Sequence, residues 1–177
     1  GVENLIIDLR DNPGGGLIEV LNVAYTMIPE DEIIVSIRSK NGNEDIYRSE
    51  GGDKISMRLV VMVNSNSASA SELLTGALQD YGLATIVGTQ TFGKGIVQSY
   101  FHLSGENGWA KMTTDAYYTP NGVCIQNVGI TPDIVVDLPA DLKDASIDFL
   151  DPAQDTQLQA AIQAFGQQAK APQTANR

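Results

Sequence analysis

The chain has 177 residues, 42% of them hydrophobic, and its 22 acidic and 11 basic side chains give a formal net charge of −11. This composition supports one sizeable core, so we expect one domain, and the acidic balance argues against nucleic acid as a partner. One cysteine excludes an intramolecular disulfide, and with one histidine it leaves too few ligands for a structural zinc cluster, so we expect neither metal nor cofactor. The chain starts at Gly1 without a secretory leader pattern, which suggests a domain of a longer protein.

The first predicted elements are a short buried strand at residues 5–9 and a helix at residues 17–27, separated by a turn with three glycines. A glycine turn between strand and helix brings backbone N–H groups close to the strand end, where anions and oxyanions bind. The simpler interpretation is that the glycines only allow a tight turn.

Two further strands, residues 33–37 and 44–47, flank an Asn-Gly dipeptide and predict a hairpin at a sheet edge. A buried strand at residues 59–63 follows, then a serine-rich turn. The sequence Ser69-Ala70-Ser71-Glu72 has the form of a capping box and begins a predicted helix that ends at Gly82. Ser69 therefore lies at a helix N-terminus, beside unpaired N–H groups that could stabilise an oxyanion.

A strand at residues 84–87 leads into GTQTFGKG, where Lys94 stands between two glycines and precedes the apolar pair Ile96 and Val97. A serine nucleophile needs a base, and the chain offers few. A Ser-His-Asp triad could use only His102, a Cys-His pair only Cys124 and His102, and the remaining option is a Ser-Lys dyad. His102 lies in a predicted hairpin of residues 99–103 and 110–114, which favours a surface histidine over a catalytic one.

The C-terminal part contains a turn at residues 117–122, a strand at residues 134–136 and an amphipathic helix that begins near Gln154. Cys124 is interpreted as a lone packed thiol. We expect residues 1–166 to form the domain and residues 167–177 to be a disordered tail. Helices alternate with strands early and hairpins follow late, so the predicted class is α/β with a mixed β-sheet and flanking helices.

Three segments together resemble the C-terminal processing peptidases, also called tail-specific proteases. They are LIIDLRDNPGG at residues 5–15, VNSNSASASE with the later TIVGTQTFGKGIVQ, and the YYTPxGxxIQxxGIxPD pattern at residues 117–133. The resemblance implies a crotonase-like or ClpP-like catalytic core in which Ser69 is the nucleophile and Lys94, 25 positions later, is the base. It further implies that Gln98 assists the lysine and that the oxyanion N–H groups come from Gly14 or Gly15 and from Ala70.

By the same resemblance the protein is a serine endopeptidase whose substrates have apolar C-terminal tails. The family's PDZ domain captures those tails and is missing from this stretch of sequence, which leaves open whether the fragment is active alone. The implied setting is extracytoplasmic, in a periplasm, cell envelope or lumen, and the oligomeric state, a homo-oligomer included, stays open. The lysine must be neutral to act as a base, and we expect burial among Phe92, Ile96 and Val97 to disfavour its charged form.

Two other interpretations compete. Residues 88–94 fit G-x-x-x-x-G-K, the phosphate-binding loop of nucleotide-binding proteins, but Gly95 replaces the required Ser or Thr and a strand follows in place of a helix. A catalytically inactive peptide-binding module of the same fold explains Ser69 as an N-cap, Lys94 as an exposed cation and the glycines as turns. Three signatures in the family's order argue against that module.

Overall fold

The structure is a computed structural model that describes residues 1–52, 55–105, 108–143 and 145–167. Its elements follow the order β1 (Asn4–Asp8), α1 (Leu17–Tyr25), β2 (Ile33–Ser39), β3 (Glu44–Arg48), β4 (Arg58–Val63), α2 (Ala70–Asp80), β5 (Ala84–Gly88), β6 (Ile96–His102), β7 (Trp109–Tyr118), β8 (Ile134–Val135), a 3-10 turn (Ile147–Phe149) and α3 (Thr156–Gln167). The predicted disordered tail overlaps the last residue of α3 and otherwise lies outside the described residues.

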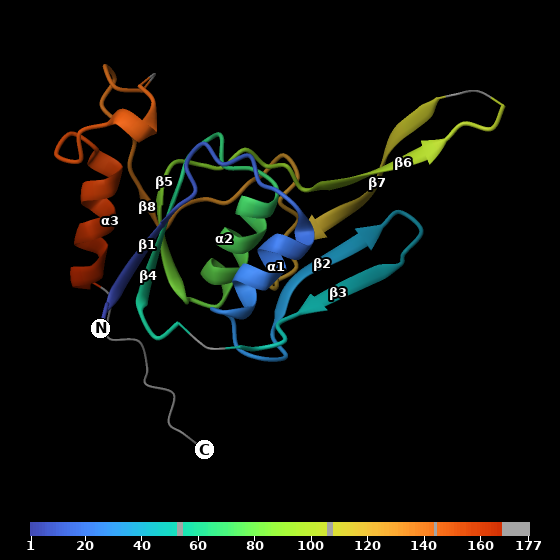
Figure 1. The fold of residues 1–177 in the computed structure, drawn as a ribbon, viewed down its shortest axis with the longest axis horizontal. Helices are drawn as coiled ribbons and strands as arrows, with labels where there is room; N and C mark the ends of the chain where they lie inside the picture. The colour runs from blue at the N-terminus through green and yellow to red at the C-terminus, as the bar shows by residue number, and fades with distance from the viewer. Residues whose placement is uncertain (53–54, 106–107, 144, 168–177) are drawn as a thin grey trace.

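A parallel sheet in the order β1-β4-β5-β8 forms one layer of the molecule. The inner strand β4 has five consecutive buried apolar residues after Arg58, as expected for a strand covered on both faces. Figure 1 shows α3 on one side of this sheet and α1 and α2 on the other. The side chains on the two faces accordingly belong to two separate hydrophobic clusters.

An antiparallel sheet in the order β3-β2-β7-β6 forms a second layer. The α/β class is confirmed, but the strands divide between two sheets where one mixed sheet was expected. Connectivity contributes to this division: α2 joins the parallel strands β4 and β5, whereas short turns join β2 to β3 and β6 to β7 as antiparallel hairpins. The outer parts of β6 and β7 extend away from the body as a two-stranded ribbon (Figure 1).

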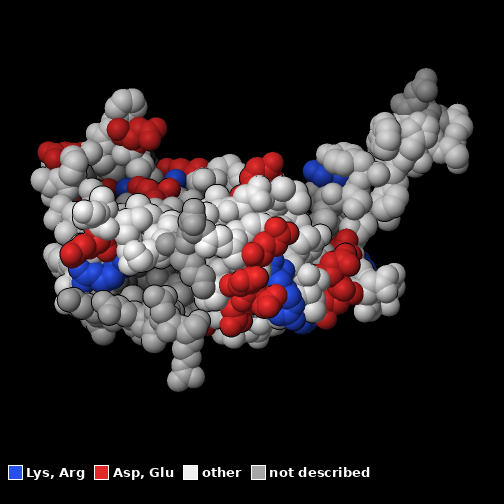
Figure 2. Space-filling model, turned by 60° about the horizontal axis from the view of Figure 1, so that its bottom comes forward, with Lys and Arg blue, Asp and Glu red and all other residues white. Residues whose placement is uncertain are grey.

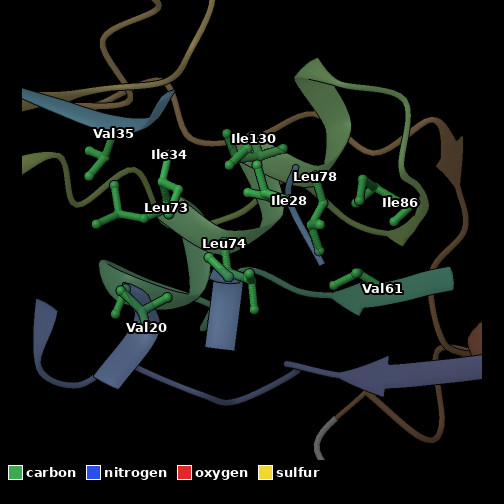
Figure 3. Packing of buried hydrophobic residues seen from close by; sticks show 14 of the residues in the cluster. Val20, Ile28, Ile34, Val35, Val61, Leu73, Leu74, Leu78, Ile86 and Ile130 are labelled. Carbon is green, nitrogen blue, oxygen red and sulfur yellow. The ribbon is translucent and has the colours of Figure 1, made fainter. Parts of the chain in front are cut away.

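Helix α2 lies between the two sheets, and every residue from Ala70 to Leu78 is buried. Figure 3 shows Leu73 near Ile34 and Val35 of β2, with Leu78 toward Ile86 of β5. A helix that is buried all round is fixed by packing on every side. The N-terminus of α2, where Ser69 stands, is therefore held rigidly by both layers.

The surface reflects the acidic composition. On the face shown in Figure 2, acidic side chains cover more area than basic ones, which form no continuous patch. None of the helices within the described ranges has the length and apolarity to cross a bilayer.

Candidate active site

Ser69 occupies a sharp turn between β4 and α2. Its backbone has φ 56° and ψ −118°, a combination that side-chain-bearing residues rarely adopt. Such strain persists only where surrounding contacts fix it, and a serine on a strained strand-to-helix turn is typical of a nucleophile presented above a sheet. The residue is half-buried at the N-terminus of α2, as the sequence predicted.

The glycine turn after β1 packs directly on this Ser69 turn. The Asn12 carbonyl accepts hydrogen bonds from the Ala68 N–H at 3.0 Å and from the Ser71 hydroxyl at 3.1 Å. A Cβ on Gly14 would lie 2.6 Å from the Ala68 carbonyl oxygen and 2.7 Å from the Ala70 nitrogen, and Gly14 has a positive φ of 93°. Only glycine fits at this position.

The Gly14 N–H is already engaged, because it donates to Asn12 Oδ1 at 2.9 Å. Among the described residues the N–H groups of Gly15 and Ala70 have no hydrogen-bond partner. Ala70 opens α2, so its N–H has no intrahelical acceptor. This arrangement favours Gly15 over Gly14 as the predicted oxyanion donor beside Ala70, and both roles stay predictions.

An apolar cavity of about 360 Å³ opens beside these two N–H groups. Its apolar lining comes from β1 and the residue that follows it, from α1 and from α2: Ile7, Leu9, Val20, Val23 and Leu74. A larger polar cavity of about 830 Å³ lies beyond the carboxyl ends of the parallel strands and includes neither Ser69 nor Lys94. The smaller cavity is the one that adjoins the Ser69 turn.

Lys94 lies in the loop between β5 and β6, and this loop is bound to the Ser69 turn. The backbone N–H groups of Ser69 and Lys94 both donate to Glu72 Oε2, each at 2.8 Å. The Phe92 N–H donates to the Ser67 carbonyl at 3.0 Å. The structure thus brings the main chains of the predicted nucleophile and base to one carboxylate.

The expected burial of Lys94 is wrong. Lys94 is exposed, and Phe92, which was expected to cover it, is 65% exposed. The two glycines that flank Lys94 are buried against residues 125–129, whereas Lys94 itself is exposed. Among the described residues no hydrogen bond joins the Lys94 side chain to the Ser69 hydroxyl, and Gln98 is exposed on β6 opposite Thr113.

The third sequence signature holds the Lys94 loop from the other side. Gln126 Oε1 accepts the Gly95 N–H at 2.8 Å, and the Asn127 N–H donates to the Gly93 carbonyl at 2.9 Å. A Cβ on Gly129 would lie only 2.5 Å from the Thr91 carbonyl oxygen. The glycines and polar residues of this signature therefore hold the loop of residues 125–130 against the Lys94 loop. The sequence pattern did not reveal this role.

Sequence analysis did not single out two buried charged residues, of which Glu72 binds the Ser69 turn and Arg10 lies near the start of the glycine turn. Glu72, known from the sequence only as part of a capping box, is buried with 0% exposure. Arg10, two residues after β1, is buried and forms ion pairs with Asp8 and Asp155. Burial alone would lower the pKa of Arg10, but its hydrogen bonds to the two carboxylates outweigh this and raise the pKa above its usual value.

The two other reactive residues lie outside this arrangement. His102 is exposed on the ribbon and meets Trp109 edge to face, with ring centroids 5.1 Å apart. Cys124 is half-buried and unpaired. Neither contributes to a triad or a Cys-His pair at Ser69.

Comparison with known proteins shows which family this chain resembles. Residues 1–136 match the model described as Peptidase family S41. A carboxy-terminal-processing protease of Bartonella bacilliformis is 48% identical over 141 residues, covering 78% of this chain and 32% of that protein. A carboxyl-terminal-processing protease of Synechocystis is 43% identical over 139 residues, with the same two coverages. The chain therefore spans about a third of the length of these curated relatives.

Among solved structures, a photosystem II D1 C-terminal processing protease superposes with a TM-score of 0.72 at 38% sequence identity. The match covers 81% of this chain and 38% of that one. A putative S41 protease from Bacteroides fragilis has the same TM-score at 17% identity, which shows a shared fold.

Proposed function

This chain belongs to peptidase family S41, and we propose that it carries the catalytic core of a serine endopeptidase with Ser69 as nucleophile and Lys94 as general base. The observation that carries the proposal is the strained Ser69 turn at the N-terminus of α2, bound through one carboxylate to the loop that bears Lys94. A strained serine beside unpaired N–H groups is suited to acyl transfer.

In this mechanism the Ser69 hydroxyl oxygen attacks the peptide carbonyl carbon while the neutral Lys94 amine takes the hydroxyl proton. The carbonyl oxygen becomes an oxyanion, which the N–H groups of Gly15 and Ala70 stabilise. Lys94 then gives the proton to the leaving amine, and the C–N bond breaks to leave an acyl-enzyme. A water molecule, deprotonated by Lys94, attacks the acyl carbon; the bond to the Ser69 oxygen breaks, and Lys94 returns the proton to that oxygen as the second product leaves. Gln98 orients the lysine throughout.

Because Lys94 is exposed in this chain, a catalytic role requires that other parts of the protein or the substrate enclose it. A lysine in water is charged at neutral pH and cannot act as a base, whereas covering it disfavours the charged form. We propose that the remaining two-thirds of the parent, or the bound substrate, encloses Lys94 and Phe92. This closure would also bring the lysine side chain to Ser69.

We further propose that the parent selects its substrates by their C-terminal tails, as the names of the relatives suggest, with a PDZ domain outside this chain as the capture device. The apolar cavity beside Gly15 and Ala70 suits an apolar substrate side chain next to the bond that is cut. Work in a periplasm, cell envelope or lumen is proposed from the family alone.

The exposed, unpaired Lys94 side chain favours one alternative, a catalytically inactive peptide-binding module of the same fold. The test uses the full-length parent and an unfolded protein with an apolar C-terminal tail. We expect Ser69→Ala and Lys94→Ala to lose at least about a thousand-fold in cleavage rate while staying folded. Lys40→Ala, which removes an exposed lysine in the β2–β3 turn, is the matched control and should cut normally.

If the parent binds tailed proteins but never cuts them, or if both variants cut as well as the parent, the dyad is wrong and the binding module takes its place. An inactive isolated fragment beside an active parent would mean that the missing part completes the site.

A further inference from the structure

The Glu72 carboxylate is the most heavily bonded side chain near Ser69, and it accepts four hydrogen bonds. Its Oε2 accepts the backbone N–H groups of Ser69 and Lys94, each at 2.8 Å. Its Oε1 accepts the Gly93 N–H at 2.7 Å and the Thr91 hydroxyl at 2.6 Å. The residue has 0% exposure, so protein donors replace water entirely.

Helix capping explains only one of these four bonds. A capping box requires the Glu72 side chain to accept the N–H of Ser69 and nothing more. The other three donors come from residues 91–94, about twenty positions later, in the loop that bears the predicted base. A buried carboxylate is costly unless donors surround it, and these donors belong to both halves of the proposed dyad.

Thr91 extends the network to the third sequence signature. Its hydroxyl oxygen accepts the Ile130 N–H at 2.6 Å and donates its own proton to Glu72. The loop of residues 125–130 is thereby connected through Thr91 and Glu72 to the Ser69 turn. A displacement in either loop would reach Ser69 and Lys94 together.

We propose that Glu72 is a positioning residue for the peptidase reaction, with Thr91 as its support. Its carboxylate holds Ser69 in the strained backbone conformation and fixes the Lys94 loop against that same turn. The inference rests on the proposed function and deepens it, because it assigns the alignment of nucleophile and base to a side chain that touches neither the substrate nor the reacting atoms.

The test replaces single groups in the full-length parent and measures kcat and KM separately for a tailed protein. Glu72→Gln keeps the side-chain shape but turns an N–H₂ group toward backbone donors. Thr91→Val keeps the volume but removes the hydroxyl, and Thr91→Ser restores it. Glu30→Gln, an exposed residue after α1, controls for the loss of one negative charge.

We expect kcat to fall about a hundred-fold in Glu72→Gln and about ten-fold in Thr91→Val, with KM within about three-fold of the parent, because a small misplacement of reacting groups costs on this scale. Thr91→Ser should recover most of the rate. The rate at which a fluorophosphonate labels Ser69 should fall in parallel, since this reaction needs an aligned nucleophile and no peptide recognition.

The proposal is overturned if folded Glu72→Gln and Thr91→Val proteins keep the parent's kcat and labelling rate and lose only thermal stability. Should Glu72→Gln fail to fold, Thr91→Val decides alone, because it removes one donor and leaves the carboxylate in place. Failure of the proposed function has a different signature, namely a parent whose cleavage does not depend on Ser69 and Lys94.

Discussion

At the scale of single residues, Gly14 and Gly15 are neighbours with different requirements. Gly14 combines a φ of 93° with backbone atoms less than 3 Å from where its Cβ would stand, whereas a Cβ on Gly15 would meet nothing within 4 Å. The sequence shows both as members of one glycine run. Only the packing of the Ser69 turn against Gly14 distinguishes them.

This difference predicts unequal effects of one methyl group on stability. Gly14→Ala in the parent should lower the free energy of unfolding of this domain by about 3 kcal/mol, because a strained backbone and an overpacked contact both add cost. Gly15→Ala should change it by less than about 0.5 kcal/mol. Calorimetric transitions of the two variants check this, and equal destabilisation would contradict the observed packing.

At the scale of elements, the site depends on loops that hold one another. The segment of residues 91–95 lies between the N-terminus of α2 and the loop of residues 125–130, with hydrogen bonds to both. Gly129 approaches Thr91 so closely that no side chain fits, although Gly122, also at positive φ, faces open space.

The contrast between these two glycines predicts that Gly129 matters for catalysis and Gly122 only for the backbone. Gly122→Ala should cost about 1 kcal/mol of stability through its φ of 77° and leave cleavage intact. Gly129→Ala should also displace Thr91 and reduce kcat by about ten-fold or more. Denaturant unfolding and steady-state cleavage of the parent separate the two effects. A Gly129→Ala variant with normal kcat would show that the loops tolerate displacement.

At the scale of the whole molecule, one buried ion-pair group joins the two faces of the parallel sheet. Arg10, two residues after β1, donates to Asp8 at 2.7 Å and to Asp155 at 3.0 Å. Asp155 in turn accepts the Leu158 N–H in the first turn of α3 at 2.9 Å. The start of the glycine turn is therefore anchored to the helix on the opposite face.

Removing Arg10 should leave the buried Asp155 carboxylate without its charged partner, and the exposed Asp8 carboxylate as well. We expect Arg10→Ala to destabilise the domain by about 3–5 kcal/mol, the range for breaking a buried pair, and to release α3 from the sheet. Arg48→Ala, which removes an exposed arginine bonded to the Asp31 carbonyl, is the matched control and should have little effect. Thermal unfolding measures both, and hydrogen exchange of α3 amides shows whether that helix is the part released.

The sequence by itself determined two kinds of feature: local secondary structure and the candidate site residues that lie in long motifs. Apolar periodicity, the S-x-x-E pattern and the glycine punctuation placed the three α-helices and most strands within a few residues. They missed the 3-10 turn Ile147–Phe149, and β7 continues to Tyr118, where a turn was predicted. The motifs identified Ser69 and Lys94 as the residues to examine, and their catalytic roles stay predictions. These signals lie within short stretches, where backbone conformation follows from neighbouring side chains.

Only the tertiary structure decided how the stretches meet. The division into two sheets, the exposure of Lys94, the distinction between Gly14 and Gly15, and the four bonds to Glu72 all depend on contacts between segments distant in sequence. Glu72 shows the reason: its sequence neighbours predict a cap with one hydrogen bond. Its other three partners belong to the loop of residues 91–94. This loop follows β5 and comes back to the N-terminus of α2 only in the folded protein.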